Sequence, residues 1–140
     1  MRKTLTLAAA LVFIGCSGTT EADYREPIVT LDAPVEVTLR IGEVTKVGDS
    51  ALNAELLHVV EDSRCPIDVT CVWAGNASVE VRLTVGTQPA TTLRVNTATA
   101  PTSVDYGTVT FSIVKVTPDP EQAVPTVPAD YRVTLRFAQR

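Results

Sequence analysis

The sequence predicts an all-β protein, either an antiparallel β-sandwich or a partly open barrel, of about seven to eight strands. Several stretches alternate apolar and polar residues, as half-buried strands do. Turn-forming residues separate these stretches at short intervals, which is typical of hairpins and antiparallel pairing. No helix start signal is followed by a convincing 3.6-residue period, and the sequence contains no βαβ unit or internal repeat.

The clearest strands are residues 35–41, 77–85 and 131–137. In each of them every second residue is apolar, so one face should be buried and the other solvated. Residues 86–89 fit a hairpin loop that leads from the second of these strands into another at 91–95. The polar positions of these strands, expected on solvated faces, include Glu80, Arg82, Arg94, Arg132 and Arg136.

Three further strands are less regular. Residues 44–47 predict a short strand. Residues 52–60 are apolar but out of phase, which indicates a bulge or burial on both faces; a helix over 51–57 is the rival interpretation. Residues 106–116 predict one strand with a phase shift near Val114.

The remaining segments are expected to connect or flank the strands. Residues 27–34 predict extended chain, with an edge strand as one option. Residues 96–103 are small and rich in threonine, which favours a loop. Residues 117–128 contain four prolines, and because proline lacks a backbone N–H, this segment cannot pair as a central strand.

The N-terminus has the features of an export signal. A short positive region precedes an apolar run that is too brief to span a membrane. The run ends in Phe13-Ile14-Gly15-Cys16, which resembles a bacterial lipobox, although Phe13 replaces the usual leucine. We therefore expect residues 1–15 to be a lipoprotein signal peptide, with lipid on Cys16; an ordinary signal with an accidental cysteine is the alternative.

This reading divides the chain into a leader, a tether and one domain. Residues 16–26 are mostly small, polar and acidic, as in a flexible tether, and residues 27–140 are enough for a single β-sandwich domain. The expected location is the cell envelope, with attachment to a membrane through acyl chains on Cys16. Ser17 resembles the residue that follows the lipidated cysteine in outer-membrane lipoproteins, if the host has two membranes.

The charge balance argues against nucleic-acid binding. The sequence has 12 Lys and Arg against 16 Asp and Glu, a net charge of −4. Loss of Arg2 and Lys3 with the leader leaves 10 basic and 16 acidic residues, and the net charge becomes −6. Such a surface repels phosphate backbones and anionic lipid headgroups.

Cys65 and Cys71 are the cysteines that remain if Cys16 carries lipid. An even pair in an exported protein predicts a disulfide. A bridge that closes so small a loop stabilises the fold by roughly 2–2.5 kcal/mol in the chain-entropy model. The sequence therefore predicts a braced connection between the strand that ends near Val60 and the strand that begins near Ala77.

The braced segment also holds the candidate binding residues. They are Asp62, Arg64, Asp68 and Trp73. In one interpretation the loop offers these side chains to a partner, since loops often carry recognition and Trp and Arg are favoured anchors. In the other, which we favour for Trp73, the indole lies over the disulfide and seals that end of the core. Arg64 is expected to pair with Asp62, Asp68 or Glu80.

The same segment resembles a signature of an uncharacterised family of small bacterial exported proteins and lipoproteins. The likeness is carried by Asp62-Ser63-Arg64-Cys65-Pro66 and by Cys71-Val72-Trp73-Ala74-Gly75-Asn76-Ala77, and it extends weakly on both sides. It implies export and, for some members, a lipid anchor. It implies no activity, substrate or functional residue.

Catalytic and metal-binding alternatives are weaker. A metal could use His58, Cys65 and Cys71, perhaps with Asp62, and calcium could use Asp62 and Asp68, but neither set has a usual ligand spacing. No Gly-x-Ser-x-Gly motif is present, and the single histidine lies in an apolar strand. We therefore expect no enzyme activity, no cofactor and no metal.

The expected function is that of a non-catalytic, lipid-anchored envelope module that presents the disulfide-braced loop to a protein or glycan partner. The alternative is a structural envelope lipoprotein without a discrete ligand site.

Overall fold

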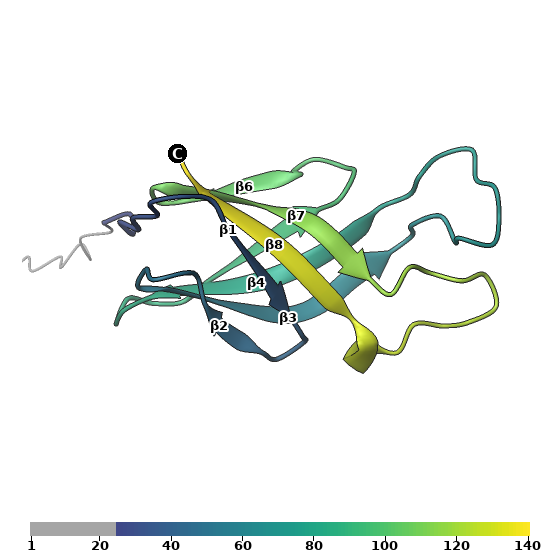
Figure 1. Cartoon of the computed structure of the whole chain (residues 1–140), viewed down its shortest axis with the longest axis horizontal. Helices are drawn as coiled ribbons and strands as arrows, with labels where there is room; N and C mark the ends of the chain where they lie inside the picture. Colours follow the sequence, from purple (N-terminus) through teal and green to yellow (C-terminus); the bar gives the residue numbers. More distant parts are fainter. Residues whose placement is uncertain (1–24) are drawn as a thin grey trace, which may run out of the picture.

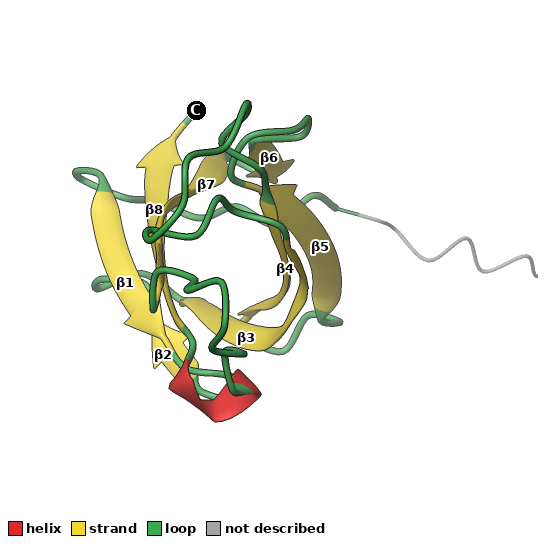
Figure 2. Cartoon of the chain, turned by 90° about the vertical axis from the view of Figure 1, so that its right-hand side faces the viewer, coloured by secondary structure: helices red, strands yellow, loops and turns green. Residues whose placement is uncertain are grey.

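Two four-stranded antiparallel sheets face each other in residues 25–140, the part of the chain that this computed structural model describes (Figure 2). One sheet has the strand order β1-β8-β7-β6, and the other has the order β2-β3-β4-β5. The strands are β1 (Val35–Leu39), β2 (Val44–Lys46), β3 (Leu52–Asp62), β4 (Ala77–Val85), β5 (Thr91–Asn96), β6 (Ser103–Tyr106), β7 (Val109–Thr117) and β8 (Arg132–Gln139). A single 3-10 turn, η1 (Pro128–Asp130), precedes β8.

The predicted β-sandwich is confirmed, and so are its irregular strands. β3 is a strand with register shifts after Leu56 and after Val59, so the bulge was the correct interpretation and the helix over 51–57 was wrong. β7 has a register shift between Ile113 and Lys115, where the apolar pattern changes phase. Each bulge adds a residue to one strand without a partner opposite it, which is why strict alternation fails there.

Two segments differ from expectation. Residues 106–116 were predicted as one strand, but the chain turns at Gly107, whose φ is +58°, and forms the hairpin of β6 and β7. Residues 27–34 form no strand; instead the backbone N–H of Val29 donates to Thr108 Oγ1 at 2.9 Å, and that of Leu31 to Gln139 Oε1 at 3.0 Å. The side chains of Val29 and Leu31 are nevertheless buried in the core.

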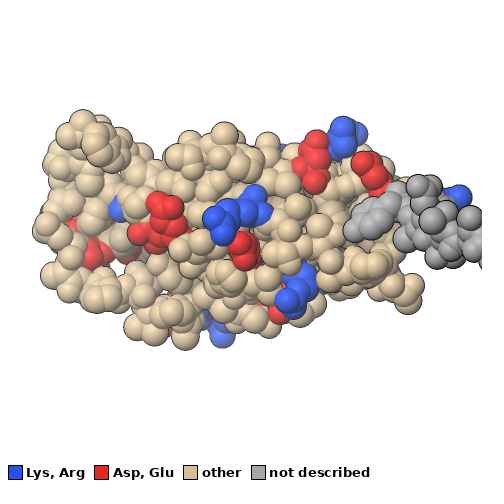
Figure 3. Space-filling model, turned by 180° about the vertical axis from the view of Figure 1, so that it is seen from behind, with Lys and Arg blue, Asp and Glu red and all other residues tan. Residues whose placement is uncertain are grey.

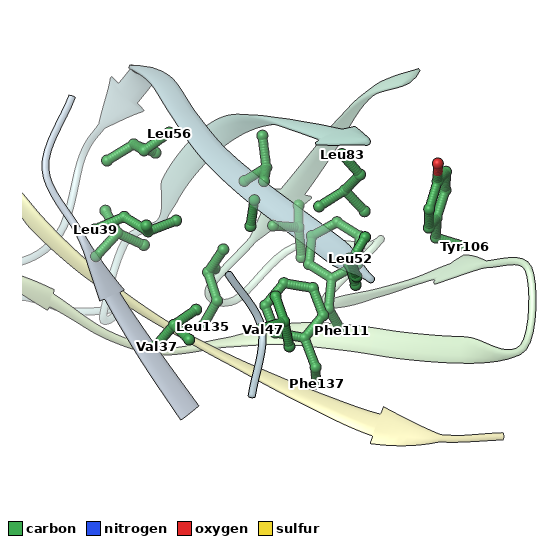
Figure 4. Packing of buried hydrophobic residues seen from close by; sticks show 14 of the residues in the cluster. Val37, Leu39, Val47, Leu52, Leu56, Leu83, Tyr106, Phe111, Leu135 and Phe137 are labelled. Atoms are coloured by element: carbon green, nitrogen blue, oxygen red, sulfur yellow. The ribbon is translucent and has the colours of Figure 1, made fainter. Parts of the chain in front are cut away.

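The core lies between the sheets (Figure 4). Phe111 of β7 and Phe137 of β8 are opposite each other in register, with ring centroids 5.5 Å apart. Leucines and valines from both sheets surround them, including Leu39 and Leu83. The alternating apolar positions of β4 are all buried, as the sequence predicts.

The outer faces are polar and carry charges of both signs. Arg94 on β5 donates to Glu80 on β4 at 2.7 Å. Arg82 on β4 donates to Glu55 on β3 at 2.8 Å, so ion pairs link neighbouring strands on the solvent face of this sheet. The hydrogen bond from Arg94 lowers the pKa of Glu80. Seen from behind, charged side chains of both signs are scattered along the molecule, with uncharged surface between them (Figure 3).

Different segments of the chain gather at the two ends of the sandwich. Residues 25–34, the turn between β6 and β7, and the C-terminus share one end (Figure 1). The long β3–β4 and β7–β8 connections share the other (Figure 1). No helix among the described residues is long and apolar enough to cross a membrane.

Three predicted features lie outside the described residues: the leader, lipid attachment at Cys16, and the tether as far as residue 24.

Candidate functional site

The β3–β4 connection, residues 63–76, is held closed at its neck and is called the cysteine loop below. The backbone N–H of Ser63 donates to the carbonyl of Asn76 at 2.7 Å, and that of Cys65 donates to Ala74 at 2.9 Å. The predicted Cys65–Cys71 disulfide is confirmed, with the sulfurs 2.12 Å apart. Sheet-like pairing therefore continues past the end of β3, and the disulfide closes the loop beyond it.

Arg64 fastens this loop to the rest of the domain. Its Nε and Nη2 donate to the two carboxylate oxygens of Asp62 at 2.8 and 2.7 Å. Its Nη1 donates to the carbonyl of Val116 at 2.6 Å, and Nη2 to that of Pro118 at 2.8 Å. The carboxylate of Asp119 lies 3.7 Å from Nη1. One guanidinium therefore joins the end of β3, the end of β7 and the start of the proline-rich connection.

Asp62 is the charged partner of this cluster and is largely buried. Tyr131 donates its hydroxyl to the second carboxylate oxygen at 3.0 Å. Burial alone would raise the pKa of Asp62, but the hydrogen bonds from Arg64 and Tyr131 outweigh it and the pKa is lowered. Burial and the neighbouring Asp62 raise the pKa of the Tyr131 phenol. The charged carboxylate is thus the form that this site favours.

A second set of contacts joins the cysteine loop to residues 118–131, called the proline loop below. The backbone N–H of Ile67 donates to the carbonyl of Pro120 at 2.9 Å. The carboxylate of Asp68 accepts the backbone N–H of Gln122 at 3.0 Å. Of the three predicted partners of Arg64, Asp62 is the one that pairs with it. Asp68 instead binds the backbone of the proline loop.

Trp73 is exposed, and the expectation that it seals the core is wrong. Its side chain is 78% exposed, and that of its neighbour Val72 is 93% exposed. At the start of the loop, Asp62 is bonded instead to Arg64 and to the hydroxyl of Tyr131. Ile67 is exposed on the same loop. The tip thus holds apolar side chains in solvent.

An open hollow of about 470 Å³, lined by both apolar and polar groups, adjoins Trp73, and its lining contains residues that the sequence did not single out. Residues 73–76 line it together with Glu61, Ser63 and the β5–β6 connection at Ala98 and Thr99. Asn76 is the centre of this arrangement: its Oδ1 accepts the backbone N–H groups of Ala98 and Thr99 at 3.0 and 3.3 Å.

Gly75 allows the two sides of the neck of the cysteine loop to approach each other closely. Its φ is +73°, and a Cβ added there would lie 1.8 Å from the carbonyl oxygen of Ser63. Only glycine allows the two sides of the neck to come this close. A glycine beside an asparagine, directly before a strand, was the sequence signal for a close approach of this kind.

The other groups proposed as metal ligands are engaged elsewhere. Within residues 25–140, no three His, Cys, Asp or Glu side chains gather so that they could hold a metal ion. Both thiols are oxidised. His58 Nε2 lies 3.0 Å from a Glu80 carboxylate oxygen on the outer face of β3 and β4.

No family model, curated protein or solved structure matches this chain. The cysteine loop is therefore interpreted from its own chemistry. It is an extensively bonded loop that holds one aromatic side chain in solvent.

Proposed function

We propose that this protein is a lipid-anchored cell-envelope module without catalytic activity, and that its cysteine loop binds a protein or glycan partner. The observation that carries the proposal is the exposure of Trp73 on a loop that is closed by a disulfide and fastened at its base by a bidentate ion pair. Rigid, exposed aromatic side chains are favoured anchors at binding sites because little conformational entropy is lost when they bind.

The roles of the four candidate residues differ in this proposal. Trp73 makes the contact. Asp62 and Arg64 position the loop, since their side chains are only 9% and 15% exposed and bond to each other. Asp68 holds the cysteine loop against the proline loop.

The place of the loop in the fold supports presentation away from a membrane. Residue 25 lies at the end of the sandwich opposite the cysteine loop (Figure 1). A domain attached through lipid on Cys16 would therefore direct Trp73 outward. The lack of a catalytic role is supported by His58, which is paired with Glu80 on an exposed sheet face, and by the oxidation of Cys65 and Cys71.

Site-specific photo-crosslinking in cells tests the recognition role. A photoreactive amino acid at Val72 is expected to give a discrete envelope adduct that disappears when Trp73→Ala is added. The matched control is Val44, an exposed valine on β2, away from the loop. The proposal fails if the two positions give the same pattern and Trp73→Ala changes no envelope phenotype.

Metabolic labelling with a clickable fatty acid tests the anchor. We expect label on the wild-type protein and none on the Cys16→Ser variant. An unlabelled wild-type protein, or label that survives the substitution, would refute the lipid anchor without bearing on the loop.

A further inference from the structure

We propose that the hollow beside Trp73 binds one pyranose ring of a glycan that carries no acidic group. This proposal deepens the proposed function and rests on it, because it assigns a ligand class to the same loop.

The size of the hollow suits a single sugar ring with its substituents. Its volume of about 470 Å³ falls in the range of roughly 300–1,000 Å³ that small-ligand sites occupy. Extended or helical peptide segments are often recognised by an apolar groove or by strand addition at a free sheet edge. The lining consists of loop residues 73–76, 98 and 99 with Glu61 and Ser63, and offers neither.

The chemistry of the lining matches the two surfaces of a pyranose. A sugar ring presents C–H groups on its faces and hydroxyl groups around its edge. Trp73 supplies an apolar aromatic face of the kind that packs against the C–H groups, and its indole N–H is a donor. Glu61 and Thr99 supply a carboxylate and a hydroxyl for the hydroxyl edge. The hydroxyl of Ser63 is used within the loop: it accepts the backbone N–H of Asn76 at 3.2 Å, and its proton lies between Glu61 Oε1 at 3.0 Å and the carbonyl of Asn76 at 3.1 Å.

Charge restricts the class of glycan. Glu61 is the only charged residue in the lining, so a phosphate or carboxylate on the sugar would be repelled. The preferred ligands are therefore neutral or amine-bearing sugars.

The walls of the hollow are fixed relative to each other. Asn76 Nδ2 donates to Asn96 Oδ1 at 3.2 Å, and both side chains are buried. The backbone N–H of Ala77 donates to Thr97 Oγ1 at 2.8 Å. The backbone N–H groups of Ala98 and Thr99 also donate to Asn76 Oδ1, and together these bonds join the cysteine loop to the β5–β6 connection. A prearranged site loses less entropy on binding, which favours recognition of a small ligand.

The single tryptophan makes a direct test possible. Trp73 is the only Trp in the sequence, so one indole N–H resonance and one fluorescence band report on the site. The full chain, with its disulfide intact and in mild detergent, is titrated with short β-1,4-linked oligomers of glucose and of N-acetylglucosamine. A glucuronic acid oligomer is the acidic control. We expect a saturable shift of the indole resonance with at least one uncharged oligomer, and weaker binding of the acidic one.

Two leucine variants locate the binding. Ala98→Leu places a larger side chain in the hollow and is expected to weaken binding by about tenfold or more, because it builds a clash against the ligand. Ala98 is exposed and bonds to Asn76 only through its backbone, so the fold should be kept. Ala90→Leu, an equal change in the exposed β4–β5 turn, should leave binding unchanged.

Four outcomes would overturn the inference, and they separate it from the proposed function. If no oligomer shifts the indole resonance at about 10 mM, where even millimolar affinity saturates the site, the glycan assignment is wrong. If binding survives Ala98→Leu, the hollow is not the site. A Trp73-dependent protein adduct at Val72 without any oligosaccharide response would leave the recognition loop standing and replace the glycan with a protein. Loss of both responses would remove both proposals.

Discussion

The base and the tip of the cysteine loop differ in how their side chains are used. At the base, Arg64 makes four hydrogen bonds to side-chain and backbone oxygens and is mostly buried. At the tip, Val72 and Trp73 are exposed. Only eight residues lie between Arg64 and Trp73, so closeness in the sequence does not decide which side chain the fold uses.

The difference indicates a division of labour within the loop. The base carries the interactions whose loss should unfold or loosen the domain, while the tip carries side chains that the fold can spare. A side chain is available to a partner when the fold does not need it but the loop that carries it is fixed in place. Substitutions along the loop can therefore separate the two roles.

Arg64→Ala should have the largest effect on stability. It leaves the Asp62 carboxylate buried without its cation and removes donors from two carbonyls. Breaking a buried pair in this way costs about 4 kcal/mol of unfolding free energy. Urea unfolding of Arg64→Ala measures it. Arg94→Ala removes an exposed pair with Glu80 and should cost less than about 1 kcal/mol. Equal losses in the two variants would contradict the buried role of Arg64.

Gly75→Ala should have the second-largest effect, about 3 kcal/mol. The added methyl both strains a backbone with φ of +73° and overlaps the backbone of Ser63. Gly86→Ala is the matched control, because Gly86 has a φ of +54° but open space around its Cβ position. The control should cost only about 1 kcal/mol. Urea unfolding compares them, and a Gly75→Ala cost no larger than the control would show that the neck can relax.

Loss of the disulfide should cost less, because the bonds of Arg64 remain. The double variant Cys65→Ser with Cys71→Ser is expected to lose roughly 2–2.5 kcal/mol in the chain-entropy model. Chemical reduction of the wild-type protein should produce the same shift in the urea midpoint, and reduction of the double variant should produce none. A double variant as stable as the oxidised wild type would show that the base alone fixes the loop.

The sequence predicted the strands well where one physical rule determines them. Alternation reports a sheet with one buried face, so β1, β4 and β8 could be placed from the pattern of valines, leucines and charges. The hairpin at Gly107 was missed because residues 106–116 hold apolar residues on both sides of the turn, and a single glycine was a weak signal against them.

The candidate site was predicted in part. Cysteine pairing follows from export and from the number of thiols, and the pairing of Arg64 with Asp62 is local in the chain. The other partners of Arg64 lie 52 and 54 residues away, on β7 and the proline loop, and no local pattern encodes them. Trp73 was expected to be buried because it is a lone aromatic residue beside a disulfide, and nothing in the local sequence shows that the loop leaves it exposed. The bonds from the backbone of Ala98 and Thr99 to Asn76 were also missed, because these residues lie more than 20 positions from Asn76 in the sequence.

Acid should destabilise the base of the cysteine loop by protonating Asp62. The loss of unfolding free energy should be smaller than for Arg64→Ala, because a protonated Asp62 side chain stays in place. The folded-state pKa of Asp62 is lowered, so between the folded and unfolded values the folded state binds fewer protons. Its contribution is therefore complete above about pH 3.9, the ordinary Asp value, and is lost as pH falls through the folded value. Urea unfolding from pH 7 to pH 2 should give a shallower acid-side decline for Asp62→Asn than for wild type.

The matched variant for this pH series is Asp105→Asn, which removes an exposed pair with Arg140. It should follow the wild-type profile, because exposed pairs add little to stability. Parallel wild-type and Asp62→Asn profiles would mean that Asp62 titrates alike in the folded and unfolded states.

Trp73→Ala should have the smallest effect on stability, within about 0.5 kcal/mol, because the indole is mostly in water before the substitution. Tyr131→Ala, which removes a buried aromatic at the same end of the sandwich, should cost about 3 kcal/mol. Urea unfolding measures both. A large loss in Trp73→Ala would mean that the indole packs on the loop and serves the fold. A small loss, joined to disappearance of the crosslinked adduct at Val72, would leave recognition as the property that depends on this side chain.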